Sequence, residues 1–343
     1  MDADVVVVGA GAVGSAAARE LARRGLDVIV LERFRAGHDR GSSHGDARVF
    51  RHSYDAPELV RMMRESIDLW RELEDEAGEP LLEVTGGIDL DPPPENAASL
   101  EAEAVPYEML SAGEASERFP SLAVPPGAKV LFQADAGIVR ADRAWRALLE
   151  GARVAGAEVR EETAVLSVSV GDERFEARTE GGLVTGRVGV VAAGAWSREL
   201  LREVGIDLPV RVTRESPVYF EAEAPPVVVV DWSREPLTYA LPSPVFGLKA
   251  AEHHAGPETD PEEGGGPEER SVERVRAWVA ERFAPMGPRP LHAEGCLYTT
   301  TADERFVLER HGPLVVASAC SGHGFKFVPW SGARAASLAA GAA

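Results

Sequence analysis

The sequence predicts a mixed α/β protein, α+β overall, with a parallel sheet near the N-terminus and a second, mainly antiparallel sheet inserted later in the chain. The first observation is a run of four valines, residues 5–8, which ends in a glycine turn and is typical of a strand buried on both faces. The second is a helical segment rich in small residues, 15–24, followed by another apolar strand, 27–31. The third is a set of short β segments farther along, including 130–132 and 227–230.

A glycine fingerprint joins the first strand to the helix. Gly9, Gly11 and Gly14 have the spacing G-x-G-x-x-G. Gly9 permits a tight turn, Gly11 lets the backbone approach a pyrophosphate, and Gly14 lets the helix pack close to the strand. The second strand ends on Glu32, where an acid accepts hydrogen bonds from a ribose and disfavours a 2′-phosphate. This order of elements predicts a Rossmann-like dinucleotide-binding unit, but it does not separate NAD from FAD.

Composition narrows the class of protein further. A chain of 343 residues is long enough for two domains, and 45% hydrophobic with 27% charged residues is ordinary for a soluble enzyme. The net charge of −20 argues against a nucleic-acid partner. No apolar run approaches the about 18 residues of a membrane span, and the acidic N-terminus is unlike a signal peptide. We therefore expect a cytoplasmic protein. Two cysteines are too few for a zinc or iron–sulfur site, and no metal is expected.

A basic segment interrupts this acidic chain. Residues 33–52 contain five arginines, three histidines and only two acids. One interpretation is a solvated loop; the other is that these side chains converge on phosphates and on a substrate carboxylate, which arginine binds in bidentate fashion. The glycines and serines of 41–45 make the segment a turn-rich loop that can lie against a ligand.

A second glycine-rich segment lies near the C-terminus, at residues 321–327. Gly322 and Gly324 would let the backbone come close to a planar ring, and Lys326 would supply a positive charge. The alternative is that Lys326, between Phe325 and Phe327, lies on the surface with its ammonium group in solvent. Composition alone does not decide between the two.

The sequence resembles a known family, the monomeric sarcosine oxidase and N-methyltryptophan oxidase group of flavin amine oxidases, which belongs to the D-amino-acid oxidase superfamily. The matching segments occur in order along most of the chain. They are VVVVGAGAVGSAAARELARRG (5–25), GSSHGDARVFRHSY (41–54), VVAAGAWS (190–197), FGLKAAEHH (246–254), GCLYTTTADERFVLERHG (295–312) and SGHGFKFVPWSG (321–332). The second and the last of these are far more specific than the glycine fingerprint.

The resemblance implies that the cofactor is FAD and that Cys296 is the cysteine whose sulfur is attached to the 8α-methyl group of the flavin. It also implies that His44 and Arg48 lie against the flavin ring, where they favour its anionic reduced form. The other cofactor-binding residues that the resemblance and the fingerprint imply are Gly9, Gly11, Gly14, Glu32, Ser42, Arg51, Ala193, Gly194, Gly322, His323, Gly324, Phe325 and Lys326.

The same resemblance implies a substrate site. Arg51 and Lys326 match the ligands of a substrate carboxylate, and Lys249 matches the lysine at which oxygen is activated. The residues that match the walls of the substrate cavity are Tyr239, His253 and Tyr298. Two features depart from the family. Ala47 stands where relatives can have a hydroxyl side chain near the flavin, and the chain ends soon after Trp330, which puts the length of the last helix in question.

Two domains are expected from these assignments. Residues 1–80, 140–205 and 287–343 would form the FAD-binding domain, and 81–139 with 206–286 the substrate domain. Helical patterns at 58–77, 142–156 and 272–283 and a buried strand at 188–192 support this division. The protein is expected to be a monomer or a small homo-oligomer.

The implied reaction is oxidation of a secondary amine, foremost an N-methyl amino acid such as sarcosine, to an imine, with O2 reduced to H2O2. The partners are thus a small amine and O2. Cyclic imino acids such as pipecolate or proline, glycated amino acids, and a dehydrogenase that uses another electron acceptor are the alternatives that the sequence leaves open.

Overall fold

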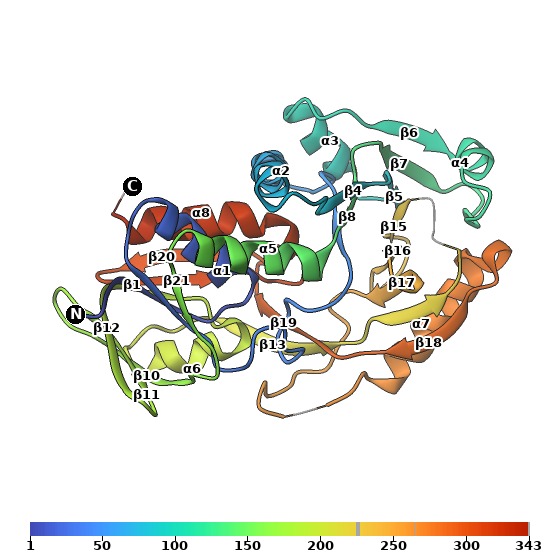
Figure 1. Ribbon diagram of the computed structural model, residues 1–343. Coiled ribbons are helices and arrows are strands. Elements are labelled where there is room, and N and C mark those ends of the chain that lie inside the picture. The colour runs from blue at the N-terminus through green and yellow to red at the C-terminus, as the bar shows by residue number, and fades with distance from the viewer. Residues whose placement is uncertain (224–226, 264, 342–343) are drawn as a thin grey trace.

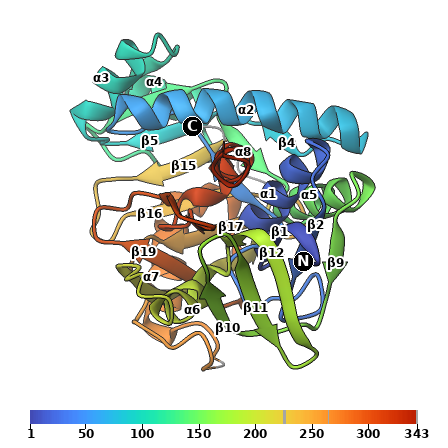
Figure 2. The same cartoon turned by 90° about the vertical axis from the view of Figure 1, so that its left-hand side faces the viewer.

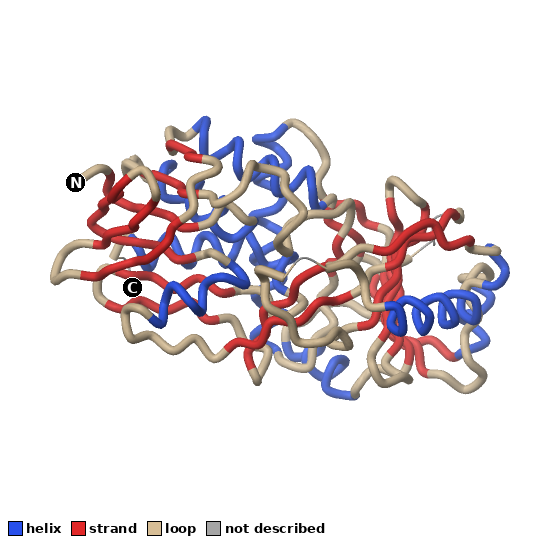
Figure 3. Tube along the Cα trace, turned by 90° about the horizontal axis from the view of Figure 1, so that it is seen from below, coloured by secondary structure: helices blue, strands red, loops and turns tan. Residues whose placement is uncertain are grey.

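The protein has two large sheets at opposite ends of an elongated molecule (Figure 3). The computed structural model describes residues 1–223, 227–263 and 265–341 (Figure 1). In this part of the chain each of the two sheets contains eight strands, and the first is parallel at its centre whereas the second is mainly antiparallel. The predicted fold class is therefore confirmed.

The first sheet is built around the valine run. Its central strand, β1, is parallel to β2 on one side and to β12 on the other, and β9 and β21 continue the parallel arrangement. Val6 and Val7 are fully buried, as expected for a strand that is covered on both faces. The strands of this sheet are β1 (Ala3–Val8), β2 (Val28–Leu31), β9 (Glu158–Arg160), β10 (Val165–Val170), β11 (Phe175–Thr179), β12 (Gly182–Val191), β20 (Val307–His311) and β21 (Leu314–Ser318).

Three helices pack together on one side of this sheet, α1 (Ala12–Arg23), α5 (Ala141–Val154) and α8 (Val328–Ala339) (Figure 1). Small side chains let them approach closely. A Cβ atom at Gly332 of α8 would lie 2.3 Å from the Cβ of Ala16 in α1, so only glycine fits there. The predicted helix at 15–24 is α1, and the one at 142–156 is α5. The last helix, whose length was in question from the sequence, is α8, which continues past Trp330 to Ala339.

The predicted helix at 58–77 is α2 (Pro57–Ala77), and both of its ends follow from sequence. Pro57 stands in the first turn, where its missing N–H costs nothing. Gly78 ends the helix with a φ of +67°, in the left-handed region that glycine adopts without penalty. Figure 2 shows α2 crossing the molecule above α8, and Trp70 of α2 donates a hydrogen bond of 2.9 Å to the carbonyl oxygen of Lys326.

The second sheet has the strand order β18-β14-β17-β16-β15-β5-β7-β6, and only its β15–β5 pair is parallel. Trp278 and Phe283 are among the buried residues of its core. Its strands are β5 (Gly87–Leu90), β6 (Glu108–Ser111), β7 (Lys129–Gln133), β14 (Val218–Glu221), β15 (Val228–Asp231), β16 (Thr238–Ser243), β17 (Gly247–Glu252) and β18 (Arg289–Ala293), and its helices are α3 (Pro94–Ala102), α4 (Ala112–Arg118) and α7 (Glu269–Arg282).

Two smaller sheets lie between the larger ones and contain several of the predicted site residues. One pairs β13 (Val210–Glu215) with β19 (Cys296–Thr301), so that β19 begins at Cys296. The other has the order β3-β8-β4, and β3 begins at Arg48. Its strands are β3 (Arg48–Phe50), β4 (Leu82–Val84) and β8 (Gly137–Val139), and the remaining helical segments are α6 (Ser197–Arg202), Gly194–Trp196, Ala284–Met286 and Gly324–Phe327.

No helix in the described ranges is both long enough and apolar enough to cross a membrane. The bounds of the two predicted domains stay a prediction.

Candidate active site

A cavity of about 1810 Å³ extends from the glycine turn after β1 to the second sheet. It exceeds the roughly 300–1,000 Å³ of ordinary small-molecule pockets, so it has room for an extended dinucleotide and a substrate. Every residue that the sequence analysis assigned to cofactor or substrate lines this cavity, except Gly14. The fold thereby brings together, around one cavity, residues that are far apart in the chain, such as Gly9, Cys296 and Lys326.

The end of the cavity at β1 fits the adenosine half of a dinucleotide. Gly9 turns the chain with a φ of +99°, and the first turn of α1 contains no acid that would repel a phosphate. Glu32, only 6% exposed, accepts hydrogen bonds from the backbone N–H groups of Ala10 (2.7 Å) and Phe34 (2.9 Å). Burial alone would raise the pKa of Glu32, but hydrogen bonds from His38 and these amides outweigh burial and lower it. A fixed, ionised carboxylate thus faces the position expected for a ribose.

Ala193 and Gly194 follow β12, on the other side of the same turn. The carbonyl oxygen of Ala192 would lie 2.7 Å from a Cβ atom at Gly9, so the two segments are in close contact. Gly194 has a φ of +54°. Both predicted residues therefore line the cavity beside the glycine turn.

Replacing Gly14 with alanine is expected to disturb this end of the cavity. The new Cβ would lie 1.9 Å from the carbonyl oxygen of Gly9, so α1 would have to move away from the turn. We expect Gly14→Ala to lower the free energy of unfolding by about 1–3 kcal/mol and to lower the FAD content of the purified protein. Thermal unfolding and flavin absorbance measure both. The control is Gly113→Ala, where the nearest atom lies 4.0 Å away. If both variants behaved alike, close packing at Gly14 would be disproved.

The loop of residues 41–48 forms the middle of the cavity. Arg48 donates hydrogen bonds to the carbonyl oxygens of Ser42 (3.2 Å) and His44 (2.5 Å), and its Nη2 lies 4.0 Å from the Sγ of Cys296. Ser42 in turn donates to the carbonyl oxygen of Leu297, next to Cys296. The loop that contains His44 and Arg48 is thereby fixed against the start of β19.

His44 and Cys296 differ in what surrounds them. Burial, followed by the charge of Arg48, lowers the pKa of His44 to about 4. Its Nε2 is buried and has no hydrogen-bond partner among the described residues. An unsatisfied buried nitrogen at this point fits a cofactor that supplies the missing partner. Burial raises the pKa of the Cys296 thiol, whereas Arg48 and Lys249 oppose this increase.

Lys249 points from β17 into the cavity and is only 3% exposed. Its Nζ donates to the carbonyl oxygen of Ala47 at 3.3 Å and lies 5.0 Å from the centre of the Tyr219 ring. Burial, followed by the charge of Arg48, lowers its pKa to about 8. Ala47 lacks the hydroxyl that relatives can have, but its backbone carbonyl accepts from both Lys249 and Arg48.

Lys326 and Arg51 are close neighbours at the far end. Lys326 is 7% exposed, so the alternative of a surface lysine is wrong. Its Nζ donates to the hydroxyl of Tyr54 at 2.9 Å, and burial followed by the charge of Arg51 lowers its pKa well below the usual value. The Nη1 of Arg51 donates to the carbonyl oxygen of Ser53 and lies 3.3 Å from the Oδ2 of Asp89. A hydrogen-bond acceptor such as the substrate's carboxylate can therefore bind to both side chains, and its negative charge would favour the protonated form of Lys326.

Tyr239, His253, Tyr298 and His323 form the adjoining wall. The hydroxyl of Tyr298 lies 3.5 Å from the Nδ1 of His253, and burial raises the pKa of both tyrosines. His323 contacts Tyr54 at 3.4 Å, and burial, followed by Lys326, lowers its pKa to about 4. Both histidines are therefore neutral at neutral pH, because burial also lowers the pKa of His253.

The backbone around Gly322 explains how the C-terminal segment approaches this wall. Gly322 has a φ of +72°, and a Cβ atom there would lie 2.5 Å from the Tyr298 ring and 2.7 Å from the His253 ring. Gly324 likewise lies so close to the carbonyl oxygen of Ala319 that a side chain would clash. The backbone at Gly322 therefore lies directly against the rings of the wall, whereas its approach to the ring of a cofactor stays a prediction.

Several functional candidates escaped the sequence analysis. Tyr54 and Asp89 contact the two carboxylate-binding candidates, and Trp232 lies 5.6 Å from the guanidinium of Arg51. Tyr219 lies beneath Lys249 and donates a 2.5 Å hydrogen bond to Glu294. A signal was available for Tyr54, because it lies in the segment of residues 41–54 that matches the family.

Comparison with known proteins agrees with this geometry. A family model described as FAD dependent oxidoreductase matches residues 4–338. Peroxisomal sarcosine oxidase of Homo sapiens is 32% identical over 95% of this chain and 89% of its own length. N-methyl-L-tryptophan oxidase of Yersinia pestis is 29% identical over 99% of this chain and 95% of its own length. The solved structure of NikD, described as an unusual amino acid oxidase, has a TM-score of 0.88 at 27% identity and covers 98% of this chain and 93% of its own.

A dinucleotide-binding turn that opens into a large cavity with Arg48, Lys249 and Lys326 in its lining fits a flavin-dependent oxidoreductase. The chain belongs to the FAD dependent oxidoreductase family, within its sarcosine oxidase and N-methyl-L-tryptophan oxidase group. It is a flavin-dependent oxidase of the sarcosine oxidase type that acts on CH–NH donors, and its cofactor is FAD.

Proposed function

We propose that this protein oxidises a secondary amine that bears a carboxylate, with an N-methyl amino acid such as sarcosine as the leading substrate, and reduces O2 to H2O2. The observation that carries the proposal is the presence of Arg51, Lys326 and Lys249 in a single cavity of an otherwise strongly acidic chain. Cations are costly to bury unless an anion or a polar partner offsets the cost. A substrate carboxylate and a developing negative charge on oxygen are two such anions.

The chain's own residues orient the reaction. Bound FAD would supply the redox chemistry, a two-electron acceptor for the amine that O2 can reoxidise. Arg51 and Lys326 bind the carboxylate and so orient the amine's C–H bond. Tyr239, His253 and Tyr298 exclude water from it, and both His253 and His323 remain neutral. Lys249 supplies a fixed positive charge on another part of the wall.

Lys249 is what favours an oxidase over a dehydrogenase with another acceptor. A buried ammonium group stabilises the charge that forms when oxygen is first reduced, and it needs no reorganisation at that moment. Its pKa of about 8 leaves it mostly protonated at neutral pH. Consumption of O2 during turnover, with H2O2 formed in equal amount, supports the oxidase; turnover with an artificial acceptor only would contradict it.

The substrate is tested with a panel of N-methyl amino acids, cyclic imino acids such as pipecolate and proline, and glycated amino acids. Each is mixed anaerobically with the flavin-loaded protein, and the loss of flavin absorbance is followed. We expect the N-methyl amino acids to reduce the flavin faster than the other compounds when each compound is supplied at the same low concentration. A faster reaction with a cyclic or glycated compound would replace sarcosine as the leading substrate, and no reaction with any compound would contradict amine oxidation.

We also propose that the flavin is attached covalently through Cys296. Its thiol is buried, lies 4.0 Å from the Nη2 of Arg48 and lines the same cavity as the loop of residues 41–48. In the parent protein the yellow colour is then expected to stay with the precipitate after acid treatment. The Cys296→Ser variant is expected to release its flavin into the supernatant. Cys320 lines the cavity too, so Cys320→Ser is the matched control and should retain the colour. Release by Cys320→Ser, or retention by Cys296→Ser, would contradict the assignment.

Cytoplasmic location and a monomeric or small homo-oligomeric state stay proposals from the sequence.

A further inference from the structure

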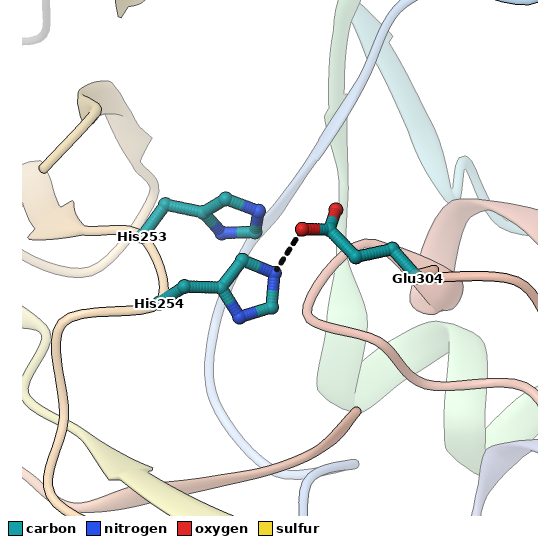
Figure 4. A group of neighbouring side chains, drawn as sticks. All are labelled: His253, His254 and Glu304. Atoms are coloured by element: carbon teal, nitrogen blue, oxygen red, sulfur yellow. Dashed lines mark ion pairs between the residues drawn. The ribbon is translucent and has the colours of Figure 1, made fainter. Parts of the chain in front are cut away.

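His253, His254 and Glu304 form a cluster beside the cavity (Figure 4). Each offers one ligand atom, and these atoms all lie within 4.8 Å of one another. Within the described residues this is the one group of three or more such side chains. The two histidines directly follow β17, and Glu304 lies in the turn between β19 and β20, so the cluster joins two segments that are far apart in the sequence.

Two features of the cluster are unusual for residues without a ligand. The Nε2 of His254 is buried and has no hydrogen-bond partner among the described residues, although it lies 3.5 Å from an Oε1 of Glu304. This separation is longer than an ordinary N–H···O hydrogen bond. In addition, His254 (φ +56°) and Glu304 (φ +58°) are both left-handed, a conformation that non-glycine residues adopt at a cost and mainly at functional sites.

The surroundings keep the cluster ready to bind an ion. Tyr298 packs edge-on against the rings of His253 and His254, with centroid separations of 5.6 and 5.5 Å, so both rings are fixed. The side chain of Glu304 is 54% exposed, which gives an ion a route from solvent.

We propose that His253, His254 and Glu304 bind a divalent transition-metal ion such as Zn²⁺ at the edge of the cavity, and that the bound ion hinders amine binding. Two imidazoles and one carboxylate are a ligand set that Zn²⁺ accepts, with a fourth position open to water. Tetrahedral ligand atoms about 2.0–2.1 Å from the metal lie roughly 3.3 Å apart. The pair formed by His254 and Glu304 is close to this spacing already, and the remaining separations, none above 4.8 Å, would have to shorten on binding.

The effect on the amine follows from what Glu304 contacts. Its carbonyl oxygen lies 3.2 Å from the Nε2 of His323, whose Nδ1 lies 3.4 Å from the hydroxyl of Tyr54. That hydroxyl accepts from Lys326, the proposed carboxylate ligand. An ion bound to Glu304 and His253 therefore restrains two parts of the cavity at once: the wall residue His253, and the segment that reaches Lys326 through His323 and Tyr54.

Zinc binding is tested by isothermal titration calorimetry of the untagged, flavin-loaded protein with ZnCl2. We expect one Zn²⁺ per chain, and a dissociation constant raised by about 10- to 100-fold or more in Glu304→Gln and His254→Asn. Asparagine tolerates the left-handed backbone, so the His254 variant keeps its conformation. The matched control is His311→Ala, because His311 and Glu309 form an exposed His–Glu pair at a similar 3.4 Å but lack a third ligand. Cys320→Ser is the control for a thiol ligand.

Four results would overturn the metal site. They are binding weaker than about 1 mM in the parent, unchanged binding in both cluster variants, loss of binding in His311→Ala, or loss of binding in Cys320→Ser alone. The second measurement is the KM for the amine, relative to each protein's own metal-free value. Zn²⁺ should raise it severalfold in the parent and in His311→Ala, reversibly with EDTA, but not in Glu304→Gln.

The KM measurement rests on the proposed function, whereas the calorimetry does not. Zinc binding at the cluster without any change in KM would contradict the proposed effect on amine binding, but it would still support the metal site. A protein that oxidises no amine would contradict the proposed function, and calorimetry would still decide the metal site.

Discussion

Replacing Lys249 with methionine is expected to slow the reaction with oxygen by about 10²–10³-fold, the usual cost of removing one preorganised charge or donor from a buried site. Methionine has a similar length and leaves no buried ion unpaired, so the variant should fold. Among the residues that the structure describes, the one hydrogen bond lost is that to the carbonyl oxygen of Ala47, which still accepts from Arg48. Anaerobic loss of flavin absorbance on mixing with amine should remain within a few-fold of the parent.

The two half-reactions are measured separately in a stopped-flow instrument. Lys129→Met is the control, since Lys129 is the one remaining lysine and is exposed at the start of β7. It should change neither rate. If the flavin of Lys249→Met were reoxidised as fast as that of the parent, the proposed role of Lys249 in oxygen activation would be wrong. An equal loss of rate in both half-reactions would indicate a general disturbance of the cavity instead.

The first sheet could be predicted from sequence because its signals are local. A valine run, a glycine fingerprint, a small-residue helix and a second strand lie within 32 consecutive residues. Helix α2 could be predicted for the same reason, since its apolar periodicity is bounded by Pro57 and Gly78. The order of the second sheet could not, because β5 pairs with β15 across a gap of more than a hundred residues. Such pairings depend on the packing of whole segments.

The candidate site shows the same limit more sharply. Nothing in the spacing of Arg48, Lys249 and Cys296 says that they lie in one cavity; only the resemblance to a family implied it. Tyr54 lies within a segment that matches the family, but only the structure reveals its contacts with Lys326 and His323. The neutrality of His253 and His323 is likewise a result of burial, which a sequence does not give directly.

The cluster of His253, His254 and Glu304 could not be predicted from sequence for a different reason. Two cysteines are too few for a zinc or iron–sulfur site, so no metal was expected from the sequence. His253 and His254 are adjacent in the chain, which is not a spacing that places two rings on one face of a helix or strand. It is the left-handed backbone at His254 that leaves both rings close to Glu304, with their centroids 4.1 Å apart.

The second large effect is expected from Lys326→Met. Loss of a charge-assisted contact costs about 1.5–3 kcal/mol, so the KM for a carboxylate-bearing amine should rise by about 10- to 150-fold. The variant should remain folded, because it replaces a buried cation with an apolar side chain of similar length. The Tyr54 hydroxyl loses its contact with Nζ but retains His323 at 3.4 Å. Steady-state kinetics and thermal unfolding measure the two effects.

What distinguishes carboxylate binding from general damage is the substrate's charge. The amide of the same N-methyl amino acid has no carboxylate, so Lys326→Met should leave the KM for the amide within a few-fold of the parent value. The control Lys129→Met should leave the KM within a few-fold for both the acid and the amide. Arg51 is a poorer choice for this test, since its removal would leave the buried Asp89 without its cation. An equal rise in KM for the acid and the amide would show that Lys326 maintains the shape of the cavity and does not bind the carboxylate.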